Sequence, residues 1–101
     1  MIIPDTISTF SVKTHKSKIS GLKTVNQYQV MSQIGKGTYS KVKKVKDRKQ
    51  NIIYAMKVIK KRHQKQESSI LKEMRHHNIV RLYEIIDDPQ HHKAFMIMEF
   101  H

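Results

Sequence analysis

The sequence predicts an α+β domain, in which a five-stranded antiparallel sheet is accompanied by one short helix in the order β-β-β-α-β-β. Two observations support this prediction. Five runs are rich in β-branched, aromatic and other apolar residues, as strands are, and one stretch between the third and fourth runs has the helical period instead. A chain of 101 residues can bury enough surface for one modest hydrophobic core.

The first three strands are expected to follow one another as an antiparallel meander. Residues 28–35 alternate between two faces, and residues 40–47 place two valines among lysines, as suits a strand with one solvated face. Residues 52–59 give the strongest strand signal of the chain. A glycine-containing loop joins the first two strands, and a polar turn over residues 47–51 joins the next two.

One helix face is predicted after the third strand. Glu67, Ile70, Leu71 and Met74 have the spacing i, i+3, i+4 and i+7, which places them on one side of a helix. Two further strand-like runs follow, at residues 79–86 and 93–100. The domain is therefore predicted to span residues 27–101.

Residues 1–26 are predicted to be a flexible basic extension. They are rich in Ser, Thr and Lys, contain one acidic residue and show no period. The stretch from Lys13 to Lys23 could bind acidic surfaces or could remain a solvated tail, and both interpretations stay open.

Composition excludes several classes of protein. The net charge of +12 comes from 20 Lys and Arg against 8 Asp and Glu, so either an anionic partner or a solvated basic surface is expected. There is no cysteine, which excludes a disulfide framework and fits a cytoplasmic location. No apolar run approaches the ~20 residues of a membrane span. No metal site is expected, because the pairs His76–His77 and His91–His92 have no cysteine or carboxylate at ligand spacing.

Lys57 is a lone charge within an apolar strand, where it shares a face with Ala55 and Ile59. Glu67 lies on the helix face that should pack on the sheet. An ion pair between Lys57 and Glu67 would satisfy both charges, since lysine is rarely fully buried without a partner. In the alternative, Lys57 extends to the rim of the sheet and Glu67 is solvated.

The segment IGKGTYSKVKKV, at residues 34–45, contains two glycines that let the backbone approach an anion and leave amide groups free to donate. Gly35 and Gly37 alone are weak evidence, because many hairpins use glycine. Lys57 lies twenty residues beyond Gly37, and the helix glutamate follows it. Together these three features indicate a loop that covers the phosphates of a nucleotide.

In these motifs the sequence resembles the N-terminal lobe of a eukaryotic protein kinase, from Asn26 to its end. IGKGTYSKV resembles the glycine-rich loop, and YAMKVI resembles the strand that carries the ATP-binding lysine. ESSILKEMRHHNIVRLYEII resembles the C-helix with its glutamate and the strand after it, and FMIMEFH resembles the strand that runs into the hinge.

The subfamily that the sequence resembles most is that of the calcium/calmodulin-dependent protein kinase kinases. VNQYQVMSQIGKG, YAMKVIKK and YEIIDDP carry this resemblance. Those enzymes phosphorylate the activation loops of downstream Ser/Thr kinases. A general calmodulin-dependent or AMP-activated-like kinase is the alternative.

The resemblance implies an ATP site that draws on the loop, three strands, the helix and the hinge. Lys57 would contact the α- and β-phosphates and would be held by Glu67. Met98 would occupy the gatekeeper position, and the backbone of Glu99 and His101 would hydrogen-bond the adenine edge. The ATP-contacting residues that the resemblance implies are Ile34, Gly35, Lys36, Gly37, Thr38, Tyr39, Ser40, Val42, Ala55, Lys57, Glu67, Met98, Glu99 and His101.

Three departures from the kinase pattern are visible. Ser40 stands where a third glycine is usual, and His77 stands where proline is usual. Nine residues separate Lys57 from Glu67, which is fewer than the family has. The C-helix is therefore expected to be short and to begin near His63.

The motifs HRD, DFG and APE are absent from the chain, so no catalytic residue is expected within it. These motifs supply the catalytic base and the Mg²⁺ ligands, so Mg²⁺ is expected only in a full-length enzyme. We predict an ATP-binding part of a longer Ser/Thr kinase, truncated at the hinge and inactive alone. Its expected partners are the missing C-lobe, a protein substrate and, by the subfamily resemblance, calmodulin.

Two other functions stay open. A kinase-derived regulatory fragment would bind a partner protein without catalysis, through the face that meets the C-lobe. A small basic nucleic-acid-binding module is disfavoured, because the aromatic residues do not cluster among basic residues as base stacking requires. We therefore expect no nucleic-acid partner.

Overall fold

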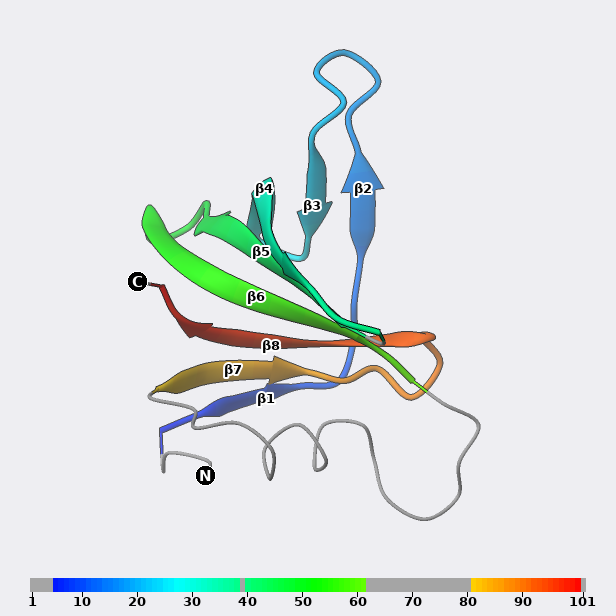
Figure 1. Cartoon of the computed structure of the whole chain (residues 1–101), viewed down its shortest axis with the longest axis vertical. Coiled ribbons are helices and arrows are strands. Elements are labelled where there is room, and N and C mark those ends of the chain that lie inside the picture. The colour runs from blue at the N-terminus through cyan, green and yellow to red at the C-terminus, as the bar shows by residue number, and fades with distance from the viewer. Residues whose placement is uncertain (1–4, 39, 62–80, 101) are drawn as a thin grey trace.

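The computed structural model describes residues 5–38, 40–61 and 81–100 of the chain. These residues form one eight-stranded sheet with the strand order β1-β7-β8-β6-β5-β4-β3-β2 (Figure 1). Neighbouring strands are antiparallel, except β1 and β7, which are parallel. The strands are β1 (Ile7–Thr9), β2 (Thr14–Lys16), β3 (Lys23–Val25), β4 (Tyr28–Lys36), β5 (Ser40–Asp47), β6 (Ile52–Lys60), β7 (Leu82–Ile86) and β8 (Lys93–Glu99).

The five strands predicted from the sequence are β4 to β8. Four of them agree with the prediction to within one residue at each end, and β7 begins three residues later than predicted. Asp47 holds the turn between β5 and β6, because its buried carboxylate accepts the N–H groups of Lys49 and Gln50 at 2.8 and 3.1 Å. Asn51 closes this turn with a φ of 62°, a conformation that asparagine tolerates better than most residues.

The predicted helix lies outside the described residues, and so do Glu67 and His77. The helical part of the α+β class and the short C-helix therefore stay predictions. The described residues show a strand-rich, curled sheet of the kind expected for a kinase N-terminal lobe, with more strands than the five that were predicted.

Residues 5–26 correct the expectation of an extension without regular structure. They contain three short strands, β1, β2 and β3, which all join the sheet. β1 pairs with β7, and β2 and β3 form a hairpin whose turn contains Gly21 at a φ of +74°. Val25 is buried in the main core, and Val12 packs against the same core. Strands of three residues are too short to show a period, so no pattern in the sequence predicts them.

The sheet is strongly curled, and its concave side is called here the inner face. The hydroxyl of Tyr28 on β4 donates a hydrogen bond to Glu84 on β7, although β5, β6 and β8 lie between these strands in the sheet. Thr9 on β1 donates a second hydrogen bond to the same carboxylate at 2.5 Å. Two strands so far apart in one sheet can only meet through such side chains if the sheet bends toward them.

The main hydrophobic core fills the inner face. Its buried members are Val25, Tyr28, Val45, Tyr54, Met56, Ile86, Phe95 and Ile97. The hydroxyl of Tyr28 is held within this core, where burial raises the pKa of the phenol and its hydrogen bond to Glu84 raises that pKa further. The phenol therefore stays protonated and remains a donor to the carboxylate.

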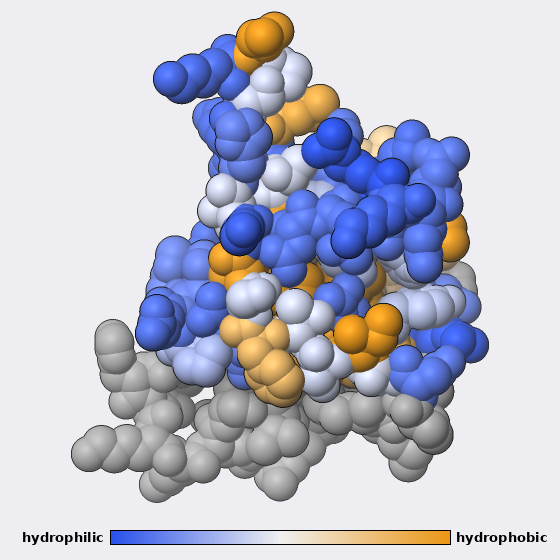
Figure 2. Space-filling model, turned by 180° about the vertical axis from the view of Figure 1, so that it is seen from behind, coloured by the Kyte–Doolittle hydropathy of each residue, from blue (hydrophilic) through white to orange (hydrophobic). Residues whose placement is uncertain are grey.

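The opposite side of the sheet is called here the Lys57 face. A second, smaller cluster of buried residues lies on it, made of Ile59, Leu82, Ile85, Ala94 and Met96. In the described ranges the chain has no helix with the length and hydropathy of a membrane span. Figure 2 shows hydrophilic side chains over much of the surface seen from behind, with smaller hydrophobic patches among them, in keeping with the net charge of +12.

Candidate functional site

Lys57 lies in a row of residues that crosses five strands of the sheet. The pairing of the strands sets Gly35 opposite Val42, Val42 opposite Lys57, Lys57 opposite Met96, and Met96 opposite Ile85. Residues directly opposite one another in antiparallel strands project from the same side. Strands β4, β5 and β6 therefore bring Gly35, Val42 and Lys57 to one surface of the sheet.

A second row lies beside the first on the Lys57 face. Lys44 pairs with Ala55, Ala55 with Met98, and Met98 with Leu82. Ala55 is two residues from Lys57 along β6, so the two side chains share this face. The structure thus brings five of the predicted ATP-contacting residues together: Gly35, Val42, Ala55, Lys57 and Met98. Whether they contact ATP stays a prediction.

The loop between β4 and β5 is tight. The N–H of Gly37 donates to the carbonyl of Ser40 at 2.7 Å. A Cβ atom at Gly37 would lie 3.2 Å from the hydroxyl of Ser40, and one at Gly35 would lie 3.5 Å from the Cβ of Val42. Of the described glycines only Gly21 has a positive φ, so Gly35 and Gly37 provide room here rather than an unusual dihedral angle.

This loop differs in one respect from the expectation of free amide donors. The Gly37 amide is already bonded within the loop, so it would have to leave Ser40 before it could donate to a phosphate. Ile34 and Lys36 lie in the same strand, where the pairing with β5 is irregular between Gln33 and Gly35. Ile34 is 50% exposed, and several other large apolar side chains of the described residues are exposed as well.

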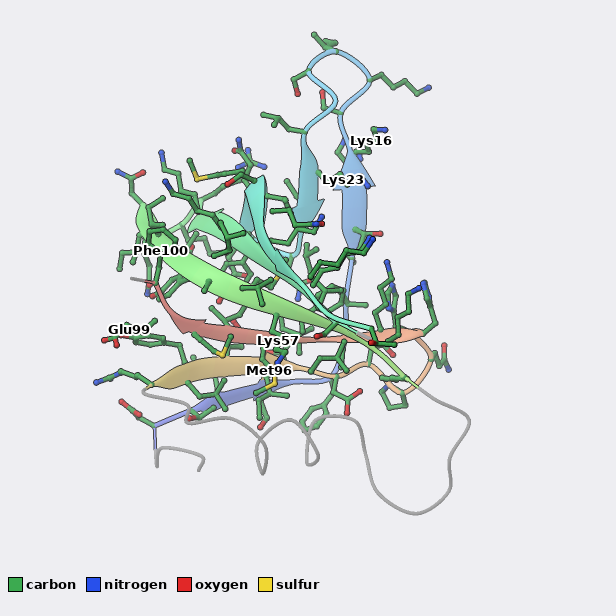
Figure 3. All side chains as sticks on the ribbon, in the orientation of Figure 1. Lys16, Lys23, Lys57, Met96, Glu99 and Phe100 are labelled. Carbon is green, nitrogen blue, oxygen red and sulfur yellow. The ribbon has the colours of Figure 1, made fainter. Side chains whose placement is uncertain are left out.

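Lys57 is largely withdrawn from water, because only 8% of the residue is exposed. Figure 3 shows it beside Met96. Its neighbours across the strands, Val42 and Met96, are apolar. A buried ammonium requires polar or anionic partners. Glu67 lies outside the described residues, so the ion pair between Lys57 and Glu67 stays a prediction.

The last residues of β8 are those that the resemblance assigned to the hinge. The N–H of Glu99 donates to the carbonyl of Arg81 at 3.1 Å, which ties the end of β8 to the start of β7. The ammonium of Lys44 lies 5.2 Å from the centre of the Phe100 ring, a cation–π contact. No local sequence pattern predicts this pair, because the two residues are far apart in the chain. Tyr39 and His101 lie outside the described residues.

No group of three or more His, Cys, Asp or Glu side chains could hold a metal ion, as far as the described residues go. The rings of His91 and His92 stack on each other with their centres 4.7 Å apart. The Nδ1 atom of His91 accepts the N–H of Lys93 at 3.1 Å. These histidines therefore interact with each other and with the backbone of the turn before β8.

Comparison with known proteins gives the family. The model of the protein kinase domain matches residues 28–101. A "Probable serine/threonine-protein kinase" from Dictyostelium discoideum is 35% identical over an alignment that covers 89% of this chain and 15% of the relative. The serine/threonine-protein kinase ssp1 of Schizosaccharomyces pombe is 30% identical and is matched over 91% of this chain and 17% of its own length.

A calcium/calmodulin-dependent protein kinase kinase from Caenorhabditis elegans is also similar, at 30% identity over 75% of this chain and 20% of the relative. The chain thus spans between 15% and 20% of the length of these three relatives. The matched region begins at the first residue of β4 and includes both rows of the Lys57 face. The chain belongs to the protein kinase family, and its named relatives place it by family among the serine/threonine protein kinases.

Proposed function

We propose that the Lys57 face is the ATP-binding surface of a serine/threonine protein kinase. The observation that carries the proposal is the row that sets the loop residue Gly35, Val42 and the buried Lys57 side by side. Packing between apolar neighbours restricts the conformations of the Lys57 side chain, so its ammonium group is held in one position. Kinases use such a lysine to position the α- and β-phosphates of ATP.

The second row supports the adenine part of this proposal. Ala55 is small, so it leaves room for a planar ring above the sheet. Val42 and Met98 border this space with apolar side chains, and we assign its outer edge to half-exposed Ile34, the neighbour of Gly35 in β4. Nucleotide and cofactor sites are lined mainly by apolar side chains, with a few polar groups that fix orientation. Here Lys57 supplies that polar group.

The chemistry that this part of the chain can perform is binding and orientation. Among the described residues of the two rows none carries a carboxylate, so these rows offer no ligand to the Mg²⁺ that accompanies ATP. The sequence also lacks the motif that holds the catalytic base. We therefore assign the transfer of the γ-phosphoryl group to the full-length enzyme, with Mg²⁺, and not to these 101 residues alone.

We infer further that the protein substrates of the full-length enzyme are other kinases. The support is the similarity to a calcium/calmodulin-dependent protein kinase kinase of Caenorhabditis elegans, together with the segments named in the sequence analysis. Phosphorylation of a kinase activation-loop peptide, compared with a generic Ser/Thr peptide, tests the substrate class. Dependence of the rate on added calmodulin tests that partner.

The ATP site itself can be tested on the chain as it stands. Binding of a fluorescent ATP analogue would be titrated for the wild type, for Lys57→Met and for Lys49→Met. Lys49 lies exposed in the turn after β5, so its variant removes the same charge away from the Lys57 face. We expect Lys57→Met to weaken binding by about tenfold or more and Lys49→Met to leave it unchanged. Equal affinities of all three proteins would contradict the proposal.

A further inference from the structure

A groove of about 350 Å³ opens on the inner face, on the side of the sheet away from the Lys57 face. Its walls come from β2, β3, β5 and the segment that leads into β8, which the curl of the sheet brings together. Its floor is apolar and includes the half-buried side chains of Val30 and Val58. The ATP site proposed above uses none of the groove's lining residues.

The groove is strongly basic. Among the described residues that line it none is Asp or Glu. Three histidines contribute to its walls, two of them the stacked pair His91 and His92. The lysines that line it are Lys16, Lys23, Lys41, Lys43 and Lys93.

The positive charges of the groove lysines repel one another. Lys16 on β2 lies directly opposite Lys23 on β3, and like charges in this position destabilise a strand pair (Figure 3). Burial lowers the pKa of Lys43, and so do the nearby charges of Lys41, Lys23 and Lys93. The charges from three different walls therefore meet within the groove, and an anion bound there would relieve their repulsion.

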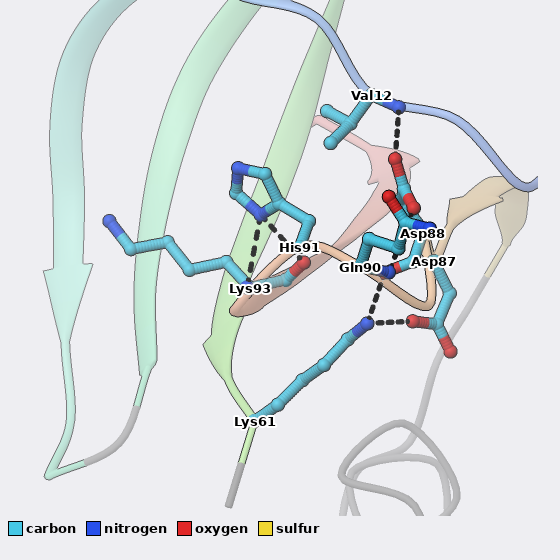
Figure 4. A network of polar contacts seen from close by, with 7 residues as sticks. All are labelled: Val12, Lys61, Asp87, Asp88, Gln90, His91 and Lys93. Atoms are coloured by element: carbon cyan, nitrogen blue, oxygen red, sulfur yellow. Dashed lines mark hydrogen bonds and ion pairs between the residues drawn. The ribbon is translucent and has the colours of Figure 1, made fainter.

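Asp87 and Asp88 are the acidic residues nearest in sequence to the lining residues His91 to Lys93, and they bond to groups outside the set of groove lysines (Figure 4). The carboxylate of Asp87 forms an ion pair with Lys61 at 2.5 Å. The carboxylate of Asp88 accepts the N–H groups of Val12 and Gln90 at 3.2 and 2.9 Å. These two carboxylates are engaged in holding the turn between β7 and β8 to its neighbours, so they do not line the groove.

We propose that this groove binds an acidic peptide segment of a partner protein, with the lysines pairing with its carboxylates and an apolar side chain of the segment resting on Val30 and Val58. Charge complementarity selects a carboxylate-rich partner. The mainly aliphatic floor suits a peptide side chain, and the described residues that line the groove include no exposed Phe, Tyr or Trp on which a nucleic-acid base could stack. The concave shape suits an inserted chain and not a flat lipid surface.

The test is the binding of a fluorescently labelled twelve-residue peptide, rich in Asp and Glu with one central Phe, followed by fluorescence anisotropy. A matched peptide carries Ser in place of Phe. The protein variants are the doubles Lys16→Glu with Lys23→Glu, and Arg48→Glu with Lys49→Glu. All four positions are exposed, and both doubles change the net charge equally, but the second pair lies in the turn after β5 and outside the groove.

The proposal predicts that the groove double weakens binding by about tenfold or more and the turn double has little effect. It also predicts that the Phe peptide binds more tightly than the Ser peptide. Equal weakening by both doubles would overturn it, because attraction would then depend on net charge alone. Tighter binding of single-stranded DNA or of vesicles containing phosphatidylserine would overturn it as well.

A single variant separates lost binding from lost folding. Lys23→Glu places a carboxylate opposite Lys16 and replaces a repulsive cross-strand pair by an attractive one. We expect its Tm to equal or exceed that of the wild type while its affinity for the acidic peptide falls. A lowered Tm together with unchanged affinity would contradict the proposal. Titration of the same variants with the ATP analogue shows whether peptide binding at the groove is lost while nucleotide binding at the Lys57 face is kept.

Discussion

The hydroxyl of Tyr28 joins β4 to β7 across the inner face, so its removal by Tyr28→Phe tests the curl of the sheet directly. Tyr28 is 3% exposed and its acceptor Glu84 is 6% exposed, so water cannot replace the lost donor. A hydrogen bond to a charged group contributes about 1.5–3 kcal/mol. Thr9 remains as a second donor to the same carboxylate. We therefore expect the free energy of unfolding to fall by about 2 kcal/mol.

This loss can be measured by urea denaturation followed by circular dichroism at neutral pH, and it corresponds to a decrease in Tm of about 8–16 °C for a domain of this size. Tyr54→Phe is the matched control, because the hydroxyl of Tyr54 donates to the neutral amide of Gln50 at 3.3 Å. We expect the control to lose less than about 1 kcal/mol. Equal losses in the two variants would refute the argument that the bond to Glu84 holds the curl.

The raised pKa of Tyr28, ordinarily 10.0, means that only the unfolded chain releases this proton above about pH 10. The stability of the wild type relative to Tyr28→Phe should therefore shrink as the pH rises above about 10, as measured by urea titrations at several pH values. Gly37→Val should weaken binding of the ATP analogue several-fold, because its Cβ would lie 3.2 Å from the Ser40 hydroxyl and displace it within the loop. Gly21→Ala should lower the stability by about 1 kcal/mol in thermal melts while nucleotide binding is kept, because only its φ of +74° is unfavourable.

The part of the fold that could be predicted is the part with strong local patterns. Strands β4, β5, β6 and β8 have seven to nine residues each, which is long enough to show alternation, and the turn after Asp47 has typical polar turn residues. The shared face of Val42, Ala55 and Lys57 follows from this alternation and from the meander. The position of Met98 beside Ala55 depends on the pairing of β6 with β8, and the sequence alone does not specify which strands pair.

The remainder could not be predicted because it depends on contacts between distant segments. β1 consists of three residues, and its partner β7 lies more than seventy residues away. The bond from Tyr28 to Glu84 spans 56 residues and exists only because the sheet curls. The basic stretch from Lys13 to Lys23 is visible in the sequence, but no local pattern places it beside Lys43 and Lys93.

The most direct test of the ATP-binding proposal is the map of amide chemical-shift changes when ATP is added to the ¹⁵N-labelled chain. This measurement matters because the basic groove could also attract the phosphates of ATP. We predict that the largest changes fall on the loop from Gly35 to Ser40 and near Lys57 and Met98, and that Lys57→Met strongly reduces them at the same ATP concentration. Changes centred instead on Lys16, Lys23 and Lys43 would contradict the assignment of the Lys57 face as the nucleotide site.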